Sequence, residues 1–152
     1  MVVQGEYRYP DGSVYNGQWD DQGQRHGQGL LTLADGGNFR GNFDQGFYSG
    51  LGVINFADGS RYCGEFLQGK FNGYGVFVRP DGMKYEGEFK DGKIKGQGLV
   101  TFSDGRHGLP RNEGCFDGER ILRREKCSKT IQRARDMAKR AIEASKTLGA
   151  SS

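Results

Sequence analysis

A repeat of about 23 residues fills most of this 152-residue sequence and decides what the chain can fold into. The dipeptide Asp-Gly marks the repeat, because it recurs at steps of 24, 23, 23 and 23 residues. The five dipeptides begin at Asp11, Asp35, Asp58, Asp81 and Asp104. Four residues after each of the first four aspartates, an aromatic residue opens the pattern aromatic-x-Gly-x-aromatic, as in Tyr62, Gly64 and Phe66. Such a period predicts a repeat protein in which each unit packs on its neighbours.

Each unit predicts a β-hairpin. The pattern aromatic-x-Gly-x-aromatic alternates with a period of two, which puts both rings and the intervening glycine on one face of a strand. The glycine leaves room for neighbouring rings to lie across the backbone. The Asp-Gly pair suits the tight turn between two strands, because both residues tolerate a positive φ angle. We therefore expect a mainly β fold, a single-layer curved antiparallel sheet of ten or so strands with a C-terminal α-helix.

The charge of the chain changes sign near residue 118. Residues 1–118 carry 12 basic and 15 acidic side chains, a balance of −3, whereas residues 119–152 carry 10 basic and 4 acidic ones, a balance of +6. Apolar residues at three- and four-residue spacings in this tail predict a helix, with Ser128 as N-cap and Gly149 as its stop. This basic helix could cap the open end of the sheet or bind anionic lipid or an acidic partner. Its Ala-rich stripe lacks the aromatic anchors of membrane-surface helices, which favours the cap.

The composition excludes several classes of protein. No apolar run approaches the roughly 20 residues of a membrane span, and the first residues lack a secretory signal, so we expect a cytoplasmic protein. Cys63, Cys115 and Cys127 have neither the number nor the spacing of a disulfide framework or a zinc site. His26 and His107 fall in turn-like segments with no nucleophile at a motif spacing. We expect no enzyme activity, no cofactor, no bound metal, no small-molecule substrate and, because the aromatic body is net acidic, no nucleic-acid partner.

The complete motif resembles a known repeat family. It reads Tyr-x-Gly-x-Trp/Phe-x-x-Gly-x-x-x-Gly-x-Gly followed by Asp-Gly, and it is similar to the MORN repeat, the "membrane occupation and recognition nexus" motif. Four full units begin at residues 15, 39, 62 and 85. A half unit at 5–14 precedes them and a degenerate unit at 108–118 follows them. We therefore divide the chain into a MORN-repeat sheet, residues 1–118, and a basic C-terminal helical segment, residues 119–152.

The last part of the sequence is similar to one small member of this family, which partners a class III myosin. The similarity lies in the stretch from Ser103 to Gly114 and in the basic run from Leu122 to Cys127. This resemblance implies a class III myosin tail as the partner. It also implies a place in actin-rich cell projections such as filopodia, stereocilia or the rhabdomeres of photoreceptors.

The aromatic residues are the candidate binding site. A single-layer sheet has no second sheet to cover them, and its length of about 40 to 45 Å exceeds the roughly 30 Å of a helix of about 20 residues. Uncovered apolar rows usually mark a protein-binding surface, so we expect a groove for an extended peptide of about 12 to 14 residues. The predicted groove residues are Tyr15, Trp19, Phe39, Phe43, Tyr62, Phe66, Tyr85 and Phe89.

Acidic residues are predicted to follow the edges of this groove, where they would favour a partner segment with basic residues. They are Asp44, Asp58, Asp81 and Asp91. Two functions follow from these features: a non-enzymatic peptide-binding adaptor, or an anionic phospholipid-binding module on a membrane surface. The balance of −3 over residues 1–118 argues against the second, which leaves the C-terminal helix as the contact with lipid headgroups.

Overall fold

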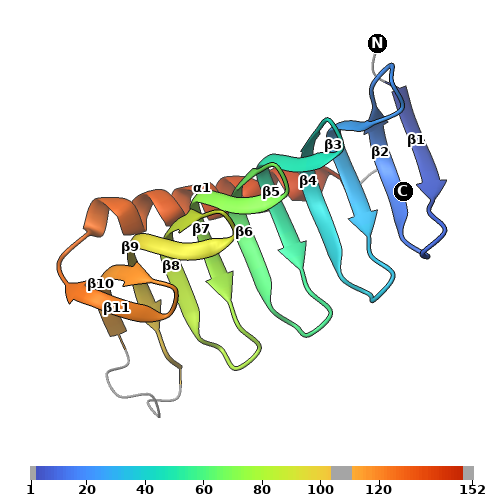
Figure 1. Ribbon diagram of the computed structural model, residues 1–152. Coiled ribbons are helices and arrows are strands. Elements are labelled where there is room, and N and C mark those ends of the chain that lie inside the picture. The colour runs from blue at the N-terminus through green and yellow to red at the C-terminus, as the bar shows by residue number, and fades with distance from the viewer. Residues whose placement is uncertain (1–2, 104–110, 149–152) are drawn as a thin grey trace.

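The chain forms one open antiparallel sheet with a helix laid across it (Figure 1). The computed structural model describes residues 3–103 and 111–148, and the predictions that concern Asp104, His107 and Gly149 lie outside these residues. In this part of the chain eleven strands pair in sequence order, which confirms the predicted fold class. They are β1 (Val3–Arg8), β2 (Val14–Trp19), β3 (Arg25–Thr32), β4 (Asn38–Asp44), β5 (Phe47–Asn55), β6 (Arg61–Leu67), β7 (Lys70–Val78), β8 (Lys84–Lys90), β9 (Lys93–Thr101), β10 (Arg111–Asp117) and β11 (Arg120–Arg124).

The strands are joined alternately at two edges of the sheet. The edge with the Asp-Gly turns is called the Asp-Gly edge. There, Asp58 Oδ1 accepts a hydrogen bond of 2.8 Å from the backbone N–H of Ser60, and Gly59 takes a φ of +97°. On the opposite edge the three turns at residues 45–46, 68–69 and 91–92 each have two consecutive residues with positive φ, as in Gln68 (49°) and Gly69 (83°). Two positive φ angles match the twist of the flanking strands and close the hairpin tightly.

One side of the sheet, called the ring face, holds the main core. The opening ring of each full unit is 0% exposed: Tyr15, Phe39, Tyr62 and Tyr85. Glycines on the next strand make room for these rings, since a Cβ at Gly75 would lie 2.4 Å from the Tyr62 Oη. The same hydroxyl donates a hydrogen bond of 2.7 Å to the carbonyl of Glu65. Glycine is therefore required where a ring crosses the neighbouring backbone.

Helix α1 (Ser128–Leu148) crosses the other side of the sheet, called the helix face (Figure 1). It contacts every strand from β3 to β9, so the prediction that it caps the open end of the sheet is wrong. The reason is side-chain size. Val53 and Cys63 on this face leave a shallow apolar strip, and Ala138 and Ala141 of the helix pack into it. The Ala-rich stripe thus fits a flat sheet surface, not a sheet end.

Two local features differ from the sequence interpretation. The sheet continues past residue 118, because β11 pairs with β10 through a register shift at Cys115 and Phe116. The charged residues of β11 are exposed, so the strand has no clear apolar alternation to reveal it. His26 lies in strand β3 and not in a turn.

Candidate functional site

The eight predicted groove residues lie together on the ring face, where most of them form its core. Seven are at most 4% exposed, and Trp19 is partly buried. They form a continuous ladder of edge-to-face contacts, with ring centroids 4.8 to 5.2 Å apart from Trp19 at one end to Tyr85 at the other. Such pairs contribute about 0.5–1.5 kcal/mol each beyond burial. The ladder therefore builds the floor of the site.

A second row of side chains covers the ladder. The Tyr48 ring stacks on Phe39 with 3.9 Å between centroids, and Phe71 stacks on Tyr62 with 4.0 Å. In the first unit an arginine takes this position, with its guanidinium carbon 5.9 Å from the Tyr15 centroid. The four residues, called the covering row, are Arg25, Tyr48, Phe71 and Ile94, and each is only partly buried.

Sequence reasoning missed the covering row. Its members share a position, two residues after the turn glycine of each unit, at Gly23, Gly46, Gly69 and Gly92. They do not share a chemistry, because the position holds Arg, Tyr, Phe and Ile in turn. A search by position within the repeat could have found them, whereas a search for repeated residue types could not.

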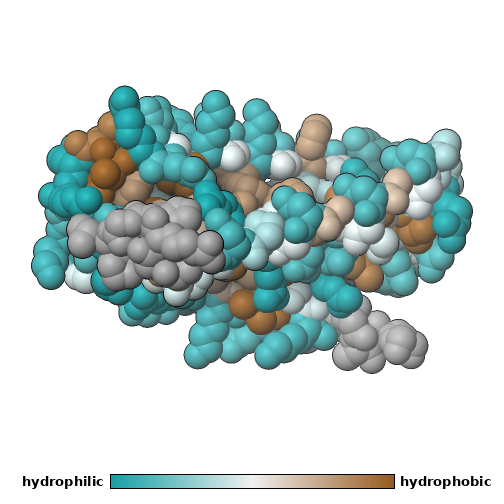
Figure 2. All heavy atoms as spheres, turned by 90° about the horizontal axis from the view of Figure 1, so that it is seen from below, coloured by the Kyte–Doolittle hydropathy of each residue, from teal (hydrophilic) through white to brown (hydrophobic). Residues whose placement is uncertain are grey.

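Three residues of the covering row, Tyr48, Phe71 and Ile94, border two adjacent apolar hollows on the ring face, and the two hollows together are called the groove. Hollow 1, of about 280 Å³, is lined by Tyr48, Ile54, Phe56, Phe66, Gly69, Lys70, Phe71 and Gly92. Hollow 2, of about 240 Å³, is lined by Phe71, Phe77, Phe89, Gly92, Lys93, Ile94, Gly118 and Glu119. Phe71 separates the hollows. From the Asp-Gly edge, Figure 2 shows hydrophobic surface recessed between polar side chains, most of it toward the end with the last strands. The groove is thus apolar inside and polar at its rims.

The predicted acidic residues are divided between the two edges. Asp44 ends strand β4 and Asp91 lies in the turn between β8 and β9, both at the opposite edge, whereas Asp58 and Asp81 lie in turns of the Asp-Gly edge. Hydrogen bonds from the side chain and backbone of Ser60 lower the pKa of the Asp58 carboxyl, so it stays charged. Two lysines also lie at the opposite edge: Lys70, at the start of β7, borders hollow 1, and Lys93, at the start of β9, borders hollow 2. Both signs of charge therefore lie around the groove.

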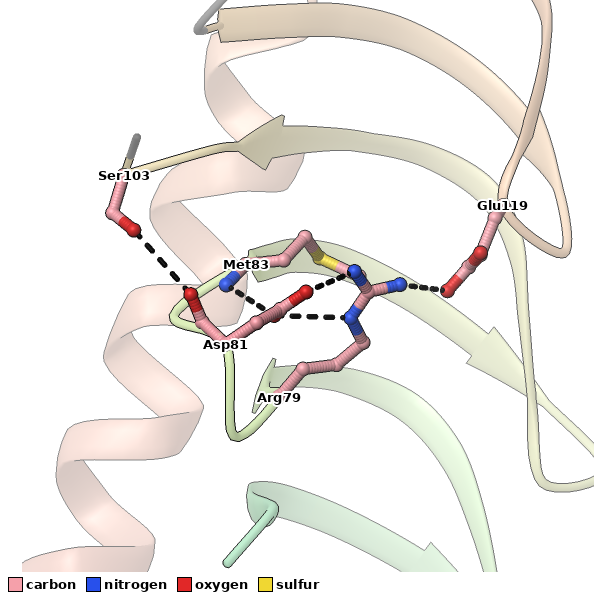
Figure 3. A network of polar contacts seen from close by, with 5 residues as sticks. All are labelled: Arg79, Asp81, Met83, Ser103 and Glu119. Atoms are coloured by element: carbon pink, nitrogen blue, oxygen red, sulfur yellow. Dashed lines mark hydrogen bonds and ion pairs between the residues drawn. The ribbon is translucent and has the colours of Figure 1, made fainter. Parts of the chain in front are cut away.

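A network of ion pairs that includes Glu119 borders hollow 2 (Figure 3). Arg79 lies at the Asp-Gly edge, and its Nη1 donates to Oε1 of Glu119 at 2.7 Å. Glu119 lies in the turn between β10 and β11, on the opposite edge, so this pair spans the groove. The Arg79 guanidinium also pairs with Asp81, whose Oδ1 accepts a hydrogen bond of 3.0 Å from the Met83 N–H. Ser103 Oγ donates to the Asp81 carbonyl at 3.5 Å.

The helix face has a different chemistry. Glu86 has a side chain only 5% exposed, and it accepts hydrogen bonds from Nε and Nη2 of Arg135 at 2.7 and 3.2 Å. The Arg133 guanidinium carbon lies 5.7 Å from the Tyr74 ring centroid. The outward side of α1 exposes basic residues, which are Lys129, Lys139, Arg140 and Lys146. This face is closed by the helix and presents charge, not apolar surface.

The repeat boundaries agree with a known family. Residues 1–14, 15–38, 39–61, 62–84 and 85–105 match the MORN repeat. The chain belongs to the MORN-repeat family. This MORN-repeat chain is also 64% identical over 137 residues to the MORN repeat-containing protein 4 homolog of Drosophila melanogaster. The aligned region covers 90% of this chain and 69% of the relative. That relative is retinophilin, so the predicted similarity to a small family member is confirmed.

The buried tyrosines of the ladder in this MORN-repeat protein keep their hydroxyl protons. Burial raises the pKa of the Tyr15 hydroxyl to about 12 and raises those of Tyr62 and Tyr85 still further, so these groups hold their protons at neutral pH. No three His, Cys, Asp or Glu side chains gather as a metal site within residues 3–103 and 111–148. In the same residues no helix is long and apolar enough to cross a membrane. The absence of catalysis stays a prediction.

Proposed function

We propose that this protein is a non-enzymatic adaptor whose groove holds an extended segment of a partner's tail, and that the partner is a class III myosin in actin-based cell protrusions. The observation that carries the proposal is the covering row with its two hollows. These side chains complete the core, yet they leave apolar surface open between charged rims. Recessed apolar surface with a polar rim is typical of a protein-binding site. The resemblance to the small myosin-binding family member supplies the partner.

The predicted groove residues take two roles in this proposal. Phe66 and Phe89 line the hollows and would contact the segment directly. Phe39 and Tyr62 position the covering row, because Tyr48 and Phe71 stack on them, and the other four belong to the ladder that holds these two rings. Acidic residues at the rims, Asp44, Asp58, Asp81 and Asp91, would meet basic residues of the tail. The segment would run across the strands, along the length of the sheet.

The test is calorimetric titration of a class III myosin tail fragment into the full chain and two variants. Phe77→Ser removes an apolar wall of hollow 2. Leu122→Ser is the matched control, since it removes an apolar side chain that is 50% exposed and lines neither hollow. We expect Phe77→Ser to weaken binding about tenfold or more, because desolvated central contacts dominate affinity, and Leu122→Ser to leave it unchanged. Circular dichroism melting checks that both variants fold. Absence of binding to the wild type, or equal loss in both variants, would contradict the proposal.

A second function, contact with an anionic phospholipid surface, is supported by the outward side of α1. Each basic residue near such a surface contributes about 1 kcal/mol of attraction. Asp136 and Glu143 are also exposed on the helix and reduce this attraction. Co-sedimentation with phosphatidylserine vesicles at physiological salt tests it: binding that Lys139→Glu with Arg140→Glu abolishes would favour this function. Retention of myosin-tail binding in that variant would keep the adaptor separate from it.

A further inference from the structure

We infer that the segment in the groove has a polyproline II-like conformation, with two bulky apolar side chains three residues apart and an acidic residue facing the lysines of the rim. The inference rests on the proposed function, since it takes the groove as the site of an extended segment. It adds the chemistry by which that segment would be recognised. Three observations carry it: the repeat of the hollows, their spacing and the charges beside them.

The two hollows are equivalent positions of consecutive units. Tyr48, Ile54 and Phe66 line hollow 1, and 23 residues further along Phe71, Phe77 and Phe89 line hollow 2. The lining residues are large and apolar in both. One segment that crosses the strands would therefore meet the same kind of pocket twice, at an interval of one hairpin.

This interval selects the conformation of the segment. One hairpin advances two strands, which is about 9.6 Å at roughly 4.8 Å per strand. Three residues of polyproline II span about 9.3 Å and complete one turn, so residues i and i+3 point the same way. In a β-strand, residues that point the same way are about 6.7 or 13 Å apart, because side chains alternate between faces. The polyproline II geometry fits both hollows at once.

The rim of the groove sets the charge between the anchors. Lys70 borders hollow 1 and Lys93 borders hollow 2, at equivalent positions of consecutive units, and both are exposed. Within residues 3–103 and 111–148 neither lysine has an ion pair with a carboxylate. Across the groove, Asp58 lies two residues beyond Phe56, which lines hollow 1. Residues i+1 and i+2 of a polyproline II segment point to different sides, so one would face the lysines and the other Asp58. An acidic residue of the segment facing Lys70 and Lys93, and a basic residue facing Asp58, would complement the charges at both edges of the groove.

Labelled dodecapeptides titrated into the full chain by fluorescence anisotropy test the spacing. The reference peptide is made in two versions, with the central sequence Leu-Glu-Lys-Leu or Leu-Lys-Glu-Leu, so that the two leucines are three residues apart. Other peptides place the second leucine two, four or seven positions after the first. We expect one order of the reference peptide to bind about tenfold more tightly than every other spacing. Proline beside an anchor should preserve or improve its affinity, because it fixes the required φ. Equal binding at all spacings, preference for seven, or no binding by any peptide would overturn the inference.

A charge exchange tests the rim. Lys70→Glu with Lys93→Glu should weaken the reference peptide about five- to tenfold and strengthen a peptide in which lysine replaces the glutamate. A gain in affinity for the peptide with the exchanged charge cannot result from unfolding of the double variant. The matched control is Lys95→Glu with Lys129→Glu, which reverses two exposed charges that border neither hollow and should change neither affinity. If the peptides behave as expected and the myosin tail fragment does not bind, the partner is wrong and the groove chemistry stands. If the tail binds and the charge exchange has no effect, the inference fails.

Discussion

The two faces of this MORN-repeat sheet are buried in different ways. On the ring face, large aromatic side chains bury one another: a ladder of rings lies on the strands and the covering row stacks on the ladder. On the helix face, small side chains such as Val53 and Cys63 are buried only because α1 lies over them. Burial by rings leaves hollows between units, whereas burial by a helix fills the surface. The difference places the candidate binding site on the ring face and a structural role on the helix face.

The largest effect is expected from the ladder. Tyr62→Ala removes a ring that is 0% exposed and supports Phe71, so it should lower the free energy of unfolding by about 3 to 5 kcal/mol. Tyr62→Phe loses only the hydrogen bond to Glu65 and should cost about 0.5–1.5 kcal/mol. Urea denaturation followed by tryptophan fluorescence measures both. A loss below about 1 kcal/mol for Tyr62→Ala would mean that this ring is part of an open surface and not of the core.

A smaller effect is expected on the helix face. Arg135→Met leaves the buried Glu86 carboxylate without its main partner and should lower the free energy of unfolding by about 1 to 3 kcal/mol. The lower part of this range is favoured, because the Arg135 side chain is 46% exposed and Lys84 lies 3.9 Å from Glu86. Arg140→Met, on the outward side of the helix, is the control and should change little. Equal losses in the two variants would show that α1 is not held by this ion pair.

At the Asp-Gly edge, which borders both faces, the Asp58 carboxyl should make the stability of the fold decrease at low pH. The pKa of Asp58 is below its ordinary value of 3.8 in the folded chain, so the charged form binds the turn more strongly. This contribution is fully present above the unfolded pKa, near pH 4, and is lost as the pH falls through the lower folded value. Thermal melting between pH 6 and pH 2 should thus show a steeper decline for the wild type than for Asp58→Asn. Parallel curves would contradict this account of the turn.

The smallest effect is expected where the ion pair spans the groove. Glu119→Gln weakens a surface pair with Arg79 and should change the free energy of unfolding by less than about 1 kcal/mol. Arg79 keeps its pair with Asp81 in this variant. Urea denaturation checks the prediction. A loss comparable to that of Tyr62→Ala would mean that the closed end of the groove is part of the core.

The sequence predicted the repeat, the hairpins and the single sheet because these depend on local spacing and on turn chemistry. Gly75 and Gly98, for example, stand at the positions where a ring must cross a strand. The place of α1 could not be predicted, since it depends on the size of side chains that only the sheet brings together. The covering row escaped for a related reason. Ile94 and Arg25 are members through position alone, and the stacking of Tyr48 on Phe39 and of Phe71 on Tyr62 joins neighbouring strands that the motif treats separately.

The most direct test of the central claim is amide hydrogen exchange of the full chain with and without the class III myosin tail fragment. The account predicts new protection in the strand segments that carry Tyr48, Phe71 and Ile94 and in the turns that precede them. It predicts no change in α1, which lies on the helix face, away from the groove. Protection confined to α1, with the segments around the two hollows unchanged, would contradict the assignment of the binding site to the ring face.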